Sequence, residues 1–587
     1  MARAASNQSL SLTGKRWLIR DCDERRRDDL VAELGVSPII AHLLLNRGVE
    51  GRDEARRFLA PDLNHLHEPG LLPDVEKAVE RIRRALGGGE RILIYGDYDA
   101  DGITATSLLL QFFRLLGVEP LVYIPNRVEE GYGLHLEAVE TAAAQGVQLI
   151  VTVDCGISGV AEVERARQLG VDVVITDHHE PGRIIPRACA VLNPKLTGSL
   201  YPYRELSGVG VAFKLAWAVA QTFSPGKRVA PEFRKFLLDA MALVALGTVA
   251  DVVPLTGENR VFAAYGLQAL RQSGSPGIAA LIRAARIEGR QLETDDVAFR
   301  LAPRLNAAGR LGAAELGVEL LTCDSPERAE AIARELEAKN RERQRIQTSI
   351  LAAARERVAG LADWAERRTI VLADEAWHAG VVGVVAAKLA EEFHRPTILL
   401  SLNGDVARGS ARSVPEFDLY AAVEACQDVL LSFGGHSQAA GLKVARERIE
   451  HFRERFEREA RRQLGGREPC GLVEIDAEVG LGGVGMALVR EVERLAPFGQ
   501  GNRSPVLACS EVVVAGRPDV VGRQDDHLAF YVRQGNTSLR AVWFGMAKRY
   551  DTMAAGNVAC DIAFVPKING WGGTEQVDLE VRDVRLR

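Results

Sequence analysis

The chain has 587 residues, which is too long for a single hydrophobic core, so we expect two to four domains. Its composition, with 47% hydrophobic and 26% charged residues and a mean hydropathy of −0.03, is typical of globular proteins and argues against the disordered and membrane-spanning classes. The net charge of −6 argues against a protein that coats nucleic acid with its whole surface, although a local basic groove is compatible with it.

Residues 1–17 have basic character but lack the apolar core of a secretory signal, and no apolar run approaches the length of a bilayer span. We therefore expect a cytoplasmic protein without membrane contact. The eight cysteines are scattered and include no CxxC pair. Neither a disulfide framework nor a structural zinc site is expected from that spacing.

The segment 75–180 alternates apolar, β-rich runs with segments of helical length. The predicted strands cover 91–95, 120–124, 148–153 and 171–176, and the predicted helices include 103–117 and 134–145. Near-continuous apolar strands that alternate with helices predict a parallel sheet covered on both faces. The ligand site of such a sheet lies beyond the carboxyl ends of its strands. Polar clusters that directly follow these strands are therefore expected to converge.

A mainly helical region, 207–273, follows the predicted sheet, and a long helix is expected after it. Asp324, Ser325 and Pro326 supply an N-cap and a proline in the first turn. The helix that begins there is expected to run to about residue 358. Its charged surface favours an exposed connector between two lobes.

The last part of the chain predicts two further folded regions. A second α/β lobe is expected at 368–460, with strands at 369–373 and 397–401. A glycine-rich stretch at 465–485 then leads to evenly spaced short strands, which predict a small antiparallel barrel or sandwich.

The first polar cluster is GDYDADGIT, residues 96–104, directly after the first predicted strand. Asp97, Asp99 and Asp101 stand at alternate positions, so their carboxylates point the same way and repel one another unless a cation neutralises them. A hard divalent metal accounts for this arrangement. A calcium loop and a solvated acidic turn are the alternatives, although a calcium loop of the EF-hand kind requires flanking helices.

Three further clusters follow later segments. Asp154 directly follows the third strand, and the run Asp177, His178 and His179 follows the fourth. An aspartate at a strand end is often only a helix cap, whereas adjacent histidines there offer a metal ligand and a group able to protonate a phosphate oxygen. Asp251 lies in the apolar stretch GTVADVVPL, where an unpaired carboxylate is costly.

Together these residues form a mixed oxygen and nitrogen ligand set. Such ligands suit Mg²⁺ or Mn²⁺ better than zinc. With Asp154 as a bridging ligand, two ions can be held a few ångströms apart, which favours phosphoester hydrolysis by a two-metal mechanism.

The strings GDYDADGIT, VTVDCGIS, TDHHEP and GTVADVVPL resemble, in order, the four motifs of DHH phosphoesterases. The resemblance implies a parallel-sheet DHH domain within an α/β protein. It also implies a catalytic set in which His179 faces the scissile phosphate and Asp97 acts as a ligand or supports the others. The implied metal ligands are Asp99, Asp101, Asp154, His178 and Asp251.

Later segments resemble the RecJ exonucleases within this superfamily. They are LAPRLNAAGRLG, WHAGVVGVVAAKLAEEFHRPTILLS, ARGSARSVPEFDL, FGGHSQAAGL and LAPFGQGNRSP. The last departs from the usual pattern, because relatives commonly have proline where Arg503 stands. The resemblance implies an N-terminal region, a DHH domain, a connecting helix, a DHH-associated domain and a C-terminal OB-type β-barrel, at 1–74, 75–323, 324–359, 360–464 and 465–587.

The RecJ resemblance implies 5′→3′ degradation of single-stranded DNA to mononucleotides, with two Mn²⁺ or Mg²⁺ ions, in recombination and DNA repair. A monomer is expected, with single-stranded-DNA-binding protein and a RecQ-type helicase as partners. Several polar groups and glycines are candidates to hold phosphates or to let the DNA backbone approach. They are Arg127, Arg304, Asn306, Arg310, Ser410, Arg412, Gly434, Gly435 and His436. For each single arginine a surface ion pair is the ordinary alternative.

Two other functions remain open at this point. One is a DHH enzyme acting on short oligonucleotides or cyclic dinucleotides, which needs neither the long helix nor the barrel. The other is a non-catalytic DNA-binding protein, which is expected to have lost metal ligands that are intact here. The barrel offers stacking candidates for single strands in Phe530, Tyr531, Trp543 and Phe544, although aromatic residues in strands are more often part of a core.

Overall fold

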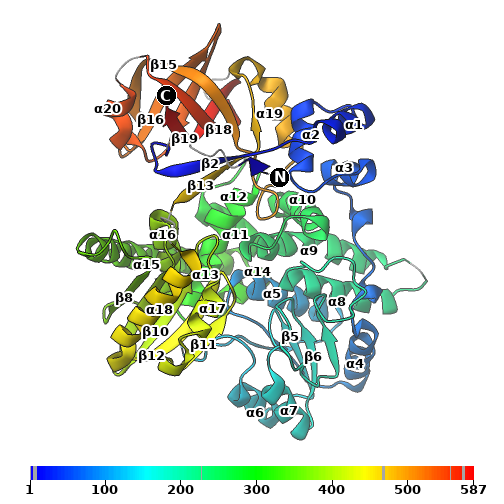
Figure 1. The fold of residues 1–587 in the computed structure, drawn as a ribbon. Helices are drawn as coiled ribbons and strands as arrows, with labels where there is room; N and C mark the ends of the chain where they lie inside the picture. The colour runs from blue at the N-terminus through cyan, green and yellow to red at the C-terminus, as the bar shows by residue number, and fades with distance from the viewer. Residues whose placement is uncertain are drawn as a thin grey trace. The chain divides into compact units, whose positions relative to one another are not determined.

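The computed structural model describes residues 2–3, 10–127, 129–226, 228–465, 470–554, 557–570 and 575–587. The chain divides into two compact units (Figure 1). The central unit is Leu63–Pro469, and the terminal unit combines Met1–Asp62 with Cys470–Arg587. No helix in these described ranges is both long and apolar enough to cross a bilayer.

The central unit contains a five-stranded, all-parallel sheet. Its strand order is β4 (Leu121–Tyr123), β3 (Ile92–Tyr95), β5 (Leu149–Val153), β6 (Asp172–Thr176) and β7 (Ala190–Leu192). The four predicted strands are confirmed, and β7 is an additional edge strand. The chain passes from β3 to β4 on one side and then crosses back to β5 on the other. The strand order therefore reverses between β3 and β5, which is where open α/β sheets bind ligands.

Helices cover both faces of this sheet because the strand residues that point to each face are mostly apolar and buried (Figure 1). Ile94 and Val151 belong to the core that includes α4 (Val75–Gly88), α5 (Ala100–Leu115) and α8 (Gly208–Thr222). Residues of the opposite alternation, such as Ile150 and Ile175, join α6 (Leu136–Ala144) and α7 (Val160–Gln168) in a separate cluster.

A helical region continues the same core. It comprises α9 (Pro231–Ala250), α10 (Gly257–Gln272), α11 (Pro276–Ala285), α12 (Thr294–Asp296), a π-helix (Val297–Leu301), α13 (Ala302–Arg310) and α14 (Glu315–Thr322). The long helix α15 (Pro326–Ala359) has 34 residues and begins at the N-cap Ser325, as predicted. It is not wholly exposed, because one stripe of it is buried against α11, α13 and α14 and another part against α16.

The second sheet of the central unit is mixed. Its order is β11 (Ser432–Gly435), β12 (Ala439–Ala445), β10 (Val406–Arg412), β9 (Thr397–Asn403) and β8 (Ile370–Asp374). Only β8 and β9 pair in parallel, and the other pairs are antiparallel. The helices of this lobe are α16 (Ala379–Phe393), α17 (Leu419–Glu424) and α18 (Ile449–Leu464). The expected α/β lobe is thereby confirmed.

The terminal unit is built on an antiparallel-rich barrel of the OB type. Its strands are β15 (Leu507–Val521), β16 (His527–Gln534), β17 (Thr537–Trp543), β19 (Gln576–Leu586) and β18 (Ala559–Asn569), and the pairing of β15 with β18 closes the barrel. Phe530 and Trp543 are buried in its core, so the prediction that they stack on the bases of single-stranded DNA is wrong. Tyr531 and Phe544 are exposed by 52% and 54%.

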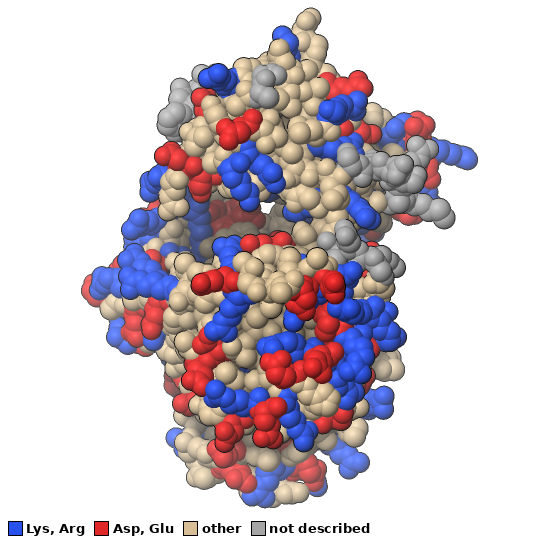
Figure 2. Space-filling view, turned by 60° about the vertical axis from the view of Figure 1, so that its left-hand side comes forward, with Lys and Arg blue, Asp and Glu red and all other residues tan. Residues whose placement is uncertain are grey.

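The N-terminal residues pack against this barrel rather than forming a unit of their own. Strand β2 (Lys15–Arg20) pairs in parallel with β13 (Gly471–Ile475). The helices α1 (Glu24–Leu34), α2 (Pro38–Leu45) and α3 (Arg52–Leu59) share a core with α19 (Met486–Glu493) and the barrel. Figure 2 shows basic and acidic side chains interspersed over the face in view, in keeping with the modest net charge.

Candidate metal centre and phosphate-binding groups

The first three carboxylates follow β3 and lie in the loop and first turn that lead into α5. Asp99 is the N-cap of α5, and its Oδ1 accepts hydrogen bonds from the N–H groups of Asp101 at 2.9 Å and Gly102 at 3.1 Å. Gly102 permits this tight turn, because a Cβ there would lie 2.5 Å from the Asp97 carbonyl oxygen. The cap therefore fixes the three aspartates relative to one another.

Asp101 is held at the N-terminus of a second helix. Its two oxygens accept hydrogen bonds from the N–H groups of Gly208 at 2.7 Å and Val209 at 2.9 Å, at the start of α8. Burial and the neighbouring Asp99 raise the pKa of Asp101 to about 7, although both N–H bonds oppose that shift. The glycine at 208 also leaves room for Asp154, whose Oδ1 would lie 2.4 Å from a Cβ at that position.

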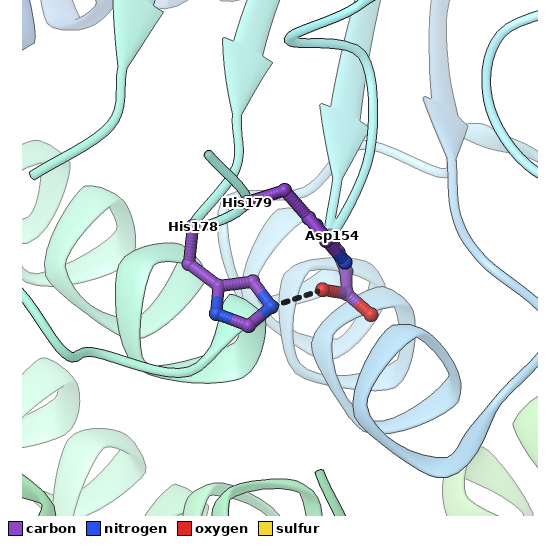
Figure 3. A group of neighbouring side chains, drawn as sticks. All are labelled: Asp154, His178 and His179. Carbon is purple, nitrogen blue, oxygen red and sulfur yellow. Dashed lines mark ion pairs between the residues drawn. The ribbon is translucent and has the colours of Figure 1, made fainter. Parts of the chain in front are cut away.

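Asp154 and His178 come from the loops after β5 and β6 and point toward each other (Figure 3). The Oδ1 of Asp154 lies 3.1 Å from Nε2 of His178, and Oδ2 of Asp251 lies 3.5 Å from the same nitrogen. Burial lowers the pKa of His178 to about 3, so the ring is neutral at physiological pH. A neutral imidazole can act as a metal ligand.

Asp154 has a left-handed backbone conformation, with φ of 59°, which is uncommon for a residue other than glycine. Burial and the charges of Asp101, Asp99 and Asp251 raise the pKa of its carboxyl group. Asp251 caps the C-terminus of α9, and burial together with Asp101 and Asp99 raises its pKa as well. Strain and repulsion in one place are typical of functional sites.

The ligand atoms fall into three overlapping groups, each with all atoms within 4.8 Å of one another. The groups are Asp154, His178 and His179; Asp101, His178 and Asp251; and Asp97, Asp99 and Asp154. Because they share Asp154 and His178, they form one cluster at the point where the strand order of the sheet reverses.

The cluster contains buried polar atoms that lack partners. Within the described ranges, Asp97 Oδ1, Asp154 Oδ1 and both ring nitrogens of His178 have no hydrogen-bond partner, since the 3.1 Å contact between Asp154 and His178 does not form a hydrogen bond. No arginine or lysine among the described residues forms an ion pair with any of the clustered aspartates. Buried carboxylates in this state are stable only when they are protonated or bind a cation. The side chains therefore fit hard divalent metal ions.

His179 differs from His178 in exposure and partners. Its Nδ1 lies 2.8 Å from Oδ1 of Asp177 and 3.0 Å from the hydroxyl of Tyr132. Asp177 also accepts hydrogen bonds from the N–H groups of Ile157, His178 and His179, so it orients the loop. Tyr132 was not predicted from the sequence, although it follows Arg127 in the segment IPNRVEEGYG.

Three of the predicted phosphate-binding arginines gather near the cluster. Arg310, the last residue of α13, donates to the carbonyl of Gly380 at 3.2 Å. Burial and then the charges of Arg127 and Arg412 lower the pKa of Arg310 to about 9. Arg412 donates to Ser410 Oγ at 3.2 Å, and Arg127 lies over the Tyr98 ring, 4.8 Å from its centroid. The charge of Arg127 opposes the rise in the pKa of Asp97, and that of Asp99 opposes the fall in the pKa of Arg310, so these like charges lie beside the carboxylates.

Arg304 and Asn306 serve the fold in this structure. Arg304 pairs with Glu337 of α15 at 2.8 Å and donates to the carbonyl of Ala284. The side-chain oxygen of Asn306 accepts the N–H of Ala100 at 2.9 Å and so supports the first turn of α5. Among the described residues, Nε of Arg304 has no hydrogen-bond partner. Phosphate binding by Arg304 and by Asn306 therefore stays a prediction.

The two glycines predicted in the second lobe are the last residues of β11, and the predicted histidine follows them in the turn to β12. Gly435 has φ of 142°, and a Cβ there would lie 2.4 Å from the Ala439 carbonyl oxygen, so the tight turn itself requires this glycine. Gly434 has open space at its Cβ position. His436 is exposed, and burial of part of its ring together with the charges of Arg412 and His179 lowers its pKa.

Comparison with known proteins agrees with this arrangement of domains. The family model for the DHH family N-terminal domain matches residues 91–248, that for the DHHA1 domain matches 366–462, and that for the RecJ OB domain matches 475–583. The single-stranded-DNA-specific exonuclease RecJ of Bacillus subtilis is 36% identical over 577 residues, which cover 97% of this chain and 71% of that protein.

Solved structures extend the likeness to the fold. RecJ from Thermus thermophilus in complex with Mn²⁺ has a TM-score of 0.83 and 31% identity, over 97% of this chain and 80% of that one. Its complex with Mg²⁺ has a TM-score of 0.77 and 28% identity, over 97% and 78%. The parallel sheet with its edge cluster defines a DHH-family protein. Within that class, the chain belongs to the RecJ family.

Proposed function

We propose that the protein is a metal-dependent exonuclease that degrades single-stranded DNA from its 5′ end and releases mononucleotides, in recombination and DNA repair. The observation that carries the proposal is the cluster of buried carboxylates and a neutral imidazole with unsatisfied ligand atoms. The relatives are named single-stranded-DNA-specific exonucleases, which supports the substrate.

Two Mn²⁺ or Mg²⁺ ions are the proposed cofactors, as oxygen-rich ligand sets favour these metals. When bound, they supply Lewis-acid stabilisation of the charge that builds on phosphorus and activate a water molecule. The residues proposed to hold them are Asp97, Asp99, Asp101, Asp154, His178 and Asp251. Asp154 is proposed as the shared ligand because it belongs to two of the three ligand groups.

The remaining groups act on the substrate. His179 is held by its contacts with Asp177 and Tyr132, so its other ring nitrogen is available to donate to a phosphate oxygen. Arg127, Arg310 and Arg412 are proposed to bind phosphates through forked hydrogen bonds. Ser410 orients Arg412, and His436 with Gly434 and Gly435 completes the proposed set at the β11–β12 turn.

Further proposals follow from the family. We propose the domain boundaries 75–323, 324–359, 360–464 and 465–587, with the N-terminal helices attached to the last of these domains. We also propose a monomer in the cytoplasm, and association with single-stranded-DNA-binding protein and a RecQ-type helicase. The OB-type barrel supports a substrate longer than a dinucleotide, because such barrels bind single strands in a groove with stacking side chains. Tyr531 and Phe544 are its exposed aromatic candidates.

One assay on end-labelled strands tests the function. A long 5′-phosphorylated DNA strand, its RNA counterpart and a dinucleotide are incubated with Mn²⁺, Mg²⁺ or chelator. We expect mononucleotides to appear from the 5′ end of the DNA strand only, and no product in chelator. Activity confined to the dinucleotide would instead assign an enzyme of short oligonucleotides. Release from the 3′ end would contradict the proposed polarity.

A further inference from the structure

The middle of α15 carries two buried amide side chains on a helix whose other buried positions are apolar. Asn340 is 3% exposed and Gln347 is 7% exposed. Buried amides are costly unless their hydrogen bonds are satisfied. The oxygens of both amides accept from one residue, since Arg343 donates from Nη1 to Gln347 Oε1 at 2.8 Å and from Nη2 to Asn340 Oδ1.

These contacts fix the direction of the Arg343 guanidinium without neutralising it. Its partners are one turn before and one turn after it on the helix, and both are uncharged. Among the residues that the structure describes, no carboxylate forms an ion pair with Arg343, although its neighbour Arg341 pairs with Glu337. A guanidinium has five N–H donors, and two are used here, so donors remain for a ligand.

Arg343 lies where three helices meet beside the proposed site. Helix α15 packs against α13, which ends at Arg310, and against α16. Arg310 donates to the carbonyl of Gly380 in the first turn of α16. One turn further along α16, a Cβ at Gly383 would lie 2.6 Å from Ser410 Oγ and 3.4 Å from Arg412 Nη2. The side chains of β10 therefore pack against α16 close to its first turn.

The packing therefore brings guanidinium groups from α13, α15 and β10 together. After burial, the charges of Arg127, Arg412 and Arg343 help to lower the pKa of Arg310, in keeping with the packing of α15 on α13. Within the described ranges, none of these four arginines has a carboxylate ion-pair partner. Grouped cations without counterions repel one another, and an anion with several oxygens relieves that repulsion.

We propose that Arg343, held in position by Asn340 and Gln347, binds a phosphate group together with Arg127, Arg310 and Arg412. The inference deepens the proposed function, on which it rests, by adding a residue of the connecting helix to the substrate site. It also implies that phosphate binding ties α15 to both lobes of the central unit, because the four arginines come from both lobes and the helix between them.

Isothermal titration calorimetry of the full chain in chelator tests the proposal without hydrolysis. The ligands are inorganic phosphate, a 5′-phosphorylated oligothymidylate and the same strand with a 5′-hydroxyl. We expect Arg343→Gln to weaken binding of inorganic phosphate and of the phosphorylated strand by about tenfold, as the loss of one charged hydrogen-bond donor predicts. Unchanged affinity for the 5′-hydroxyl strand assigns a terminal phosphate, and a parallel loss assigns a backbone phosphate.

Arg345→Gln is the matched control, because it removes the same charge from an exposed position on the same helix. It is expected to leave all three affinities within about twofold of the wild type. Asn340→Ala and Gln347→Ala keep the charge of Arg343 but release it, so each is expected to weaken phosphate binding by about threefold. These two variants also test the proposal if Arg343→Gln does not fold.

Wild-type affinity for inorganic phosphate and for the phosphorylated strand in a folded Arg343→Gln variant would overturn the proposal. So would equal losses in the Arg343→Gln and Arg345→Gln variants, since that result reflects overall charge. Failure of the proposed nuclease function is a separate result, namely the absence of metal-dependent hydrolysis of long strands by the wild type.

Discussion

Two aspartates of the first sheet have opposite surroundings. The carboxylate of Asp172, at the start of β6, pairs with Arg81 at 2.5 Å and lies 3.6 Å from Arg84. Asp154, at the end of β5, faces other carboxylates and the neutral ring of His178. The first side chain stabilises the metal-free protein, whereas the second costs free energy until a cation is bound.

Replacing Asp154 by alanine separates activity from stability. We expect Asp154→Ala to lower the rate of single-strand hydrolysis by on the order of 1,000-fold, because the proposed shared metal ligand is lost. Its metal-free unfolding temperature should equal or exceed that of the wild type, since repulsion is relieved. Asp172→Ala is the control, expected to keep activity and to lose about 1 kcal/mol of stability. Undiminished hydrolysis by Asp154→Ala would refute the site.

Replacing Arg412 tests how the protein recognises the 5′ end of a DNA strand. The Arg412 side chain is anchored by Ser410 Oγ and the Ala411 carbonyl, so its remaining donors have a defined direction. We expect Arg412→Ala to weaken binding of a 5′-phosphorylated strand about tenfold in chelator, while a 5′-hydroxyl strand loses little. Arg408→Ala, on the same strand, should alter neither affinity. Equal losses for both strands would count against end recognition by Arg412.

At the scale of elements, the sequence predicts the part of the site that strand ends create. Asp97, Asp154 and His178 each follow a continuous apolar run, and parallel strands bring the residues after such runs to one edge. The sequence singles out Asp251 only because an unpaired carboxylate in an apolar stretch is energetically unfavourable. Its partners follow from how α9 packs on α5 and α8, which no local pattern encodes.

Other features depend on contacts between distant residues. Strand β7 has only three residues, too few for a periodic signal. The pairing of β2 with β13 joins residues about 450 positions apart and assigns the N-terminal helices to the barrel. Arg343 stands on a helix whose charged composition suggests solvent exposure, so its buried amide partners become apparent only when α13 and α16 are in place.

Asp561 in β18 offers a pH test of the barrel. Burial would raise its pKa, but hydrogen bonds from Arg585, from the Glu511 N–H and from Arg587 hold the pKa below its usual value. A depressed pKa means that the carboxylate stabilises the folded state above about pH 4 and that this contribution is lost as the pH falls further.

We therefore expect Asp561→Asn to cost about 2 kcal/mol at pH 7 and progressively less below about pH 4. Pulsed hydrogen exchange at one fixed pH, after equilibration in urea at each test pH, reports the unfolding of peptides from β18 and β19. Asp519→Asn, at an exposed position of β15, should match the wild type throughout. A cost that does not change with pH would show that the Asp561 carboxylate charge has no stabilising role.

At the scale of the whole molecule, each unit has a hydrophobic core of its own. The core of the terminal unit joins α2, α19 and the barrel strands, and the largest core of the central unit joins the first sheet to α5, α8 and α9. The proposed metal ligands all belong to the central unit. Metal binding should therefore stabilise one unit and not the other.

Calorimetry of the full chain measures this difference. Saturating Mn²⁺, at about 100 times its dissociation constant, should stabilise the central unit by about 2.7 kcal/mol and raise the temperature of its transition. The transition of the terminal unit should not move, and chelator should reverse the effect. Asp154→Ala should abolish the shift because the proposed ligand shared between two of the atom groups is missing. An equal shift in that variant, or one in both transitions, would place the stabilising metal elsewhere in the protein.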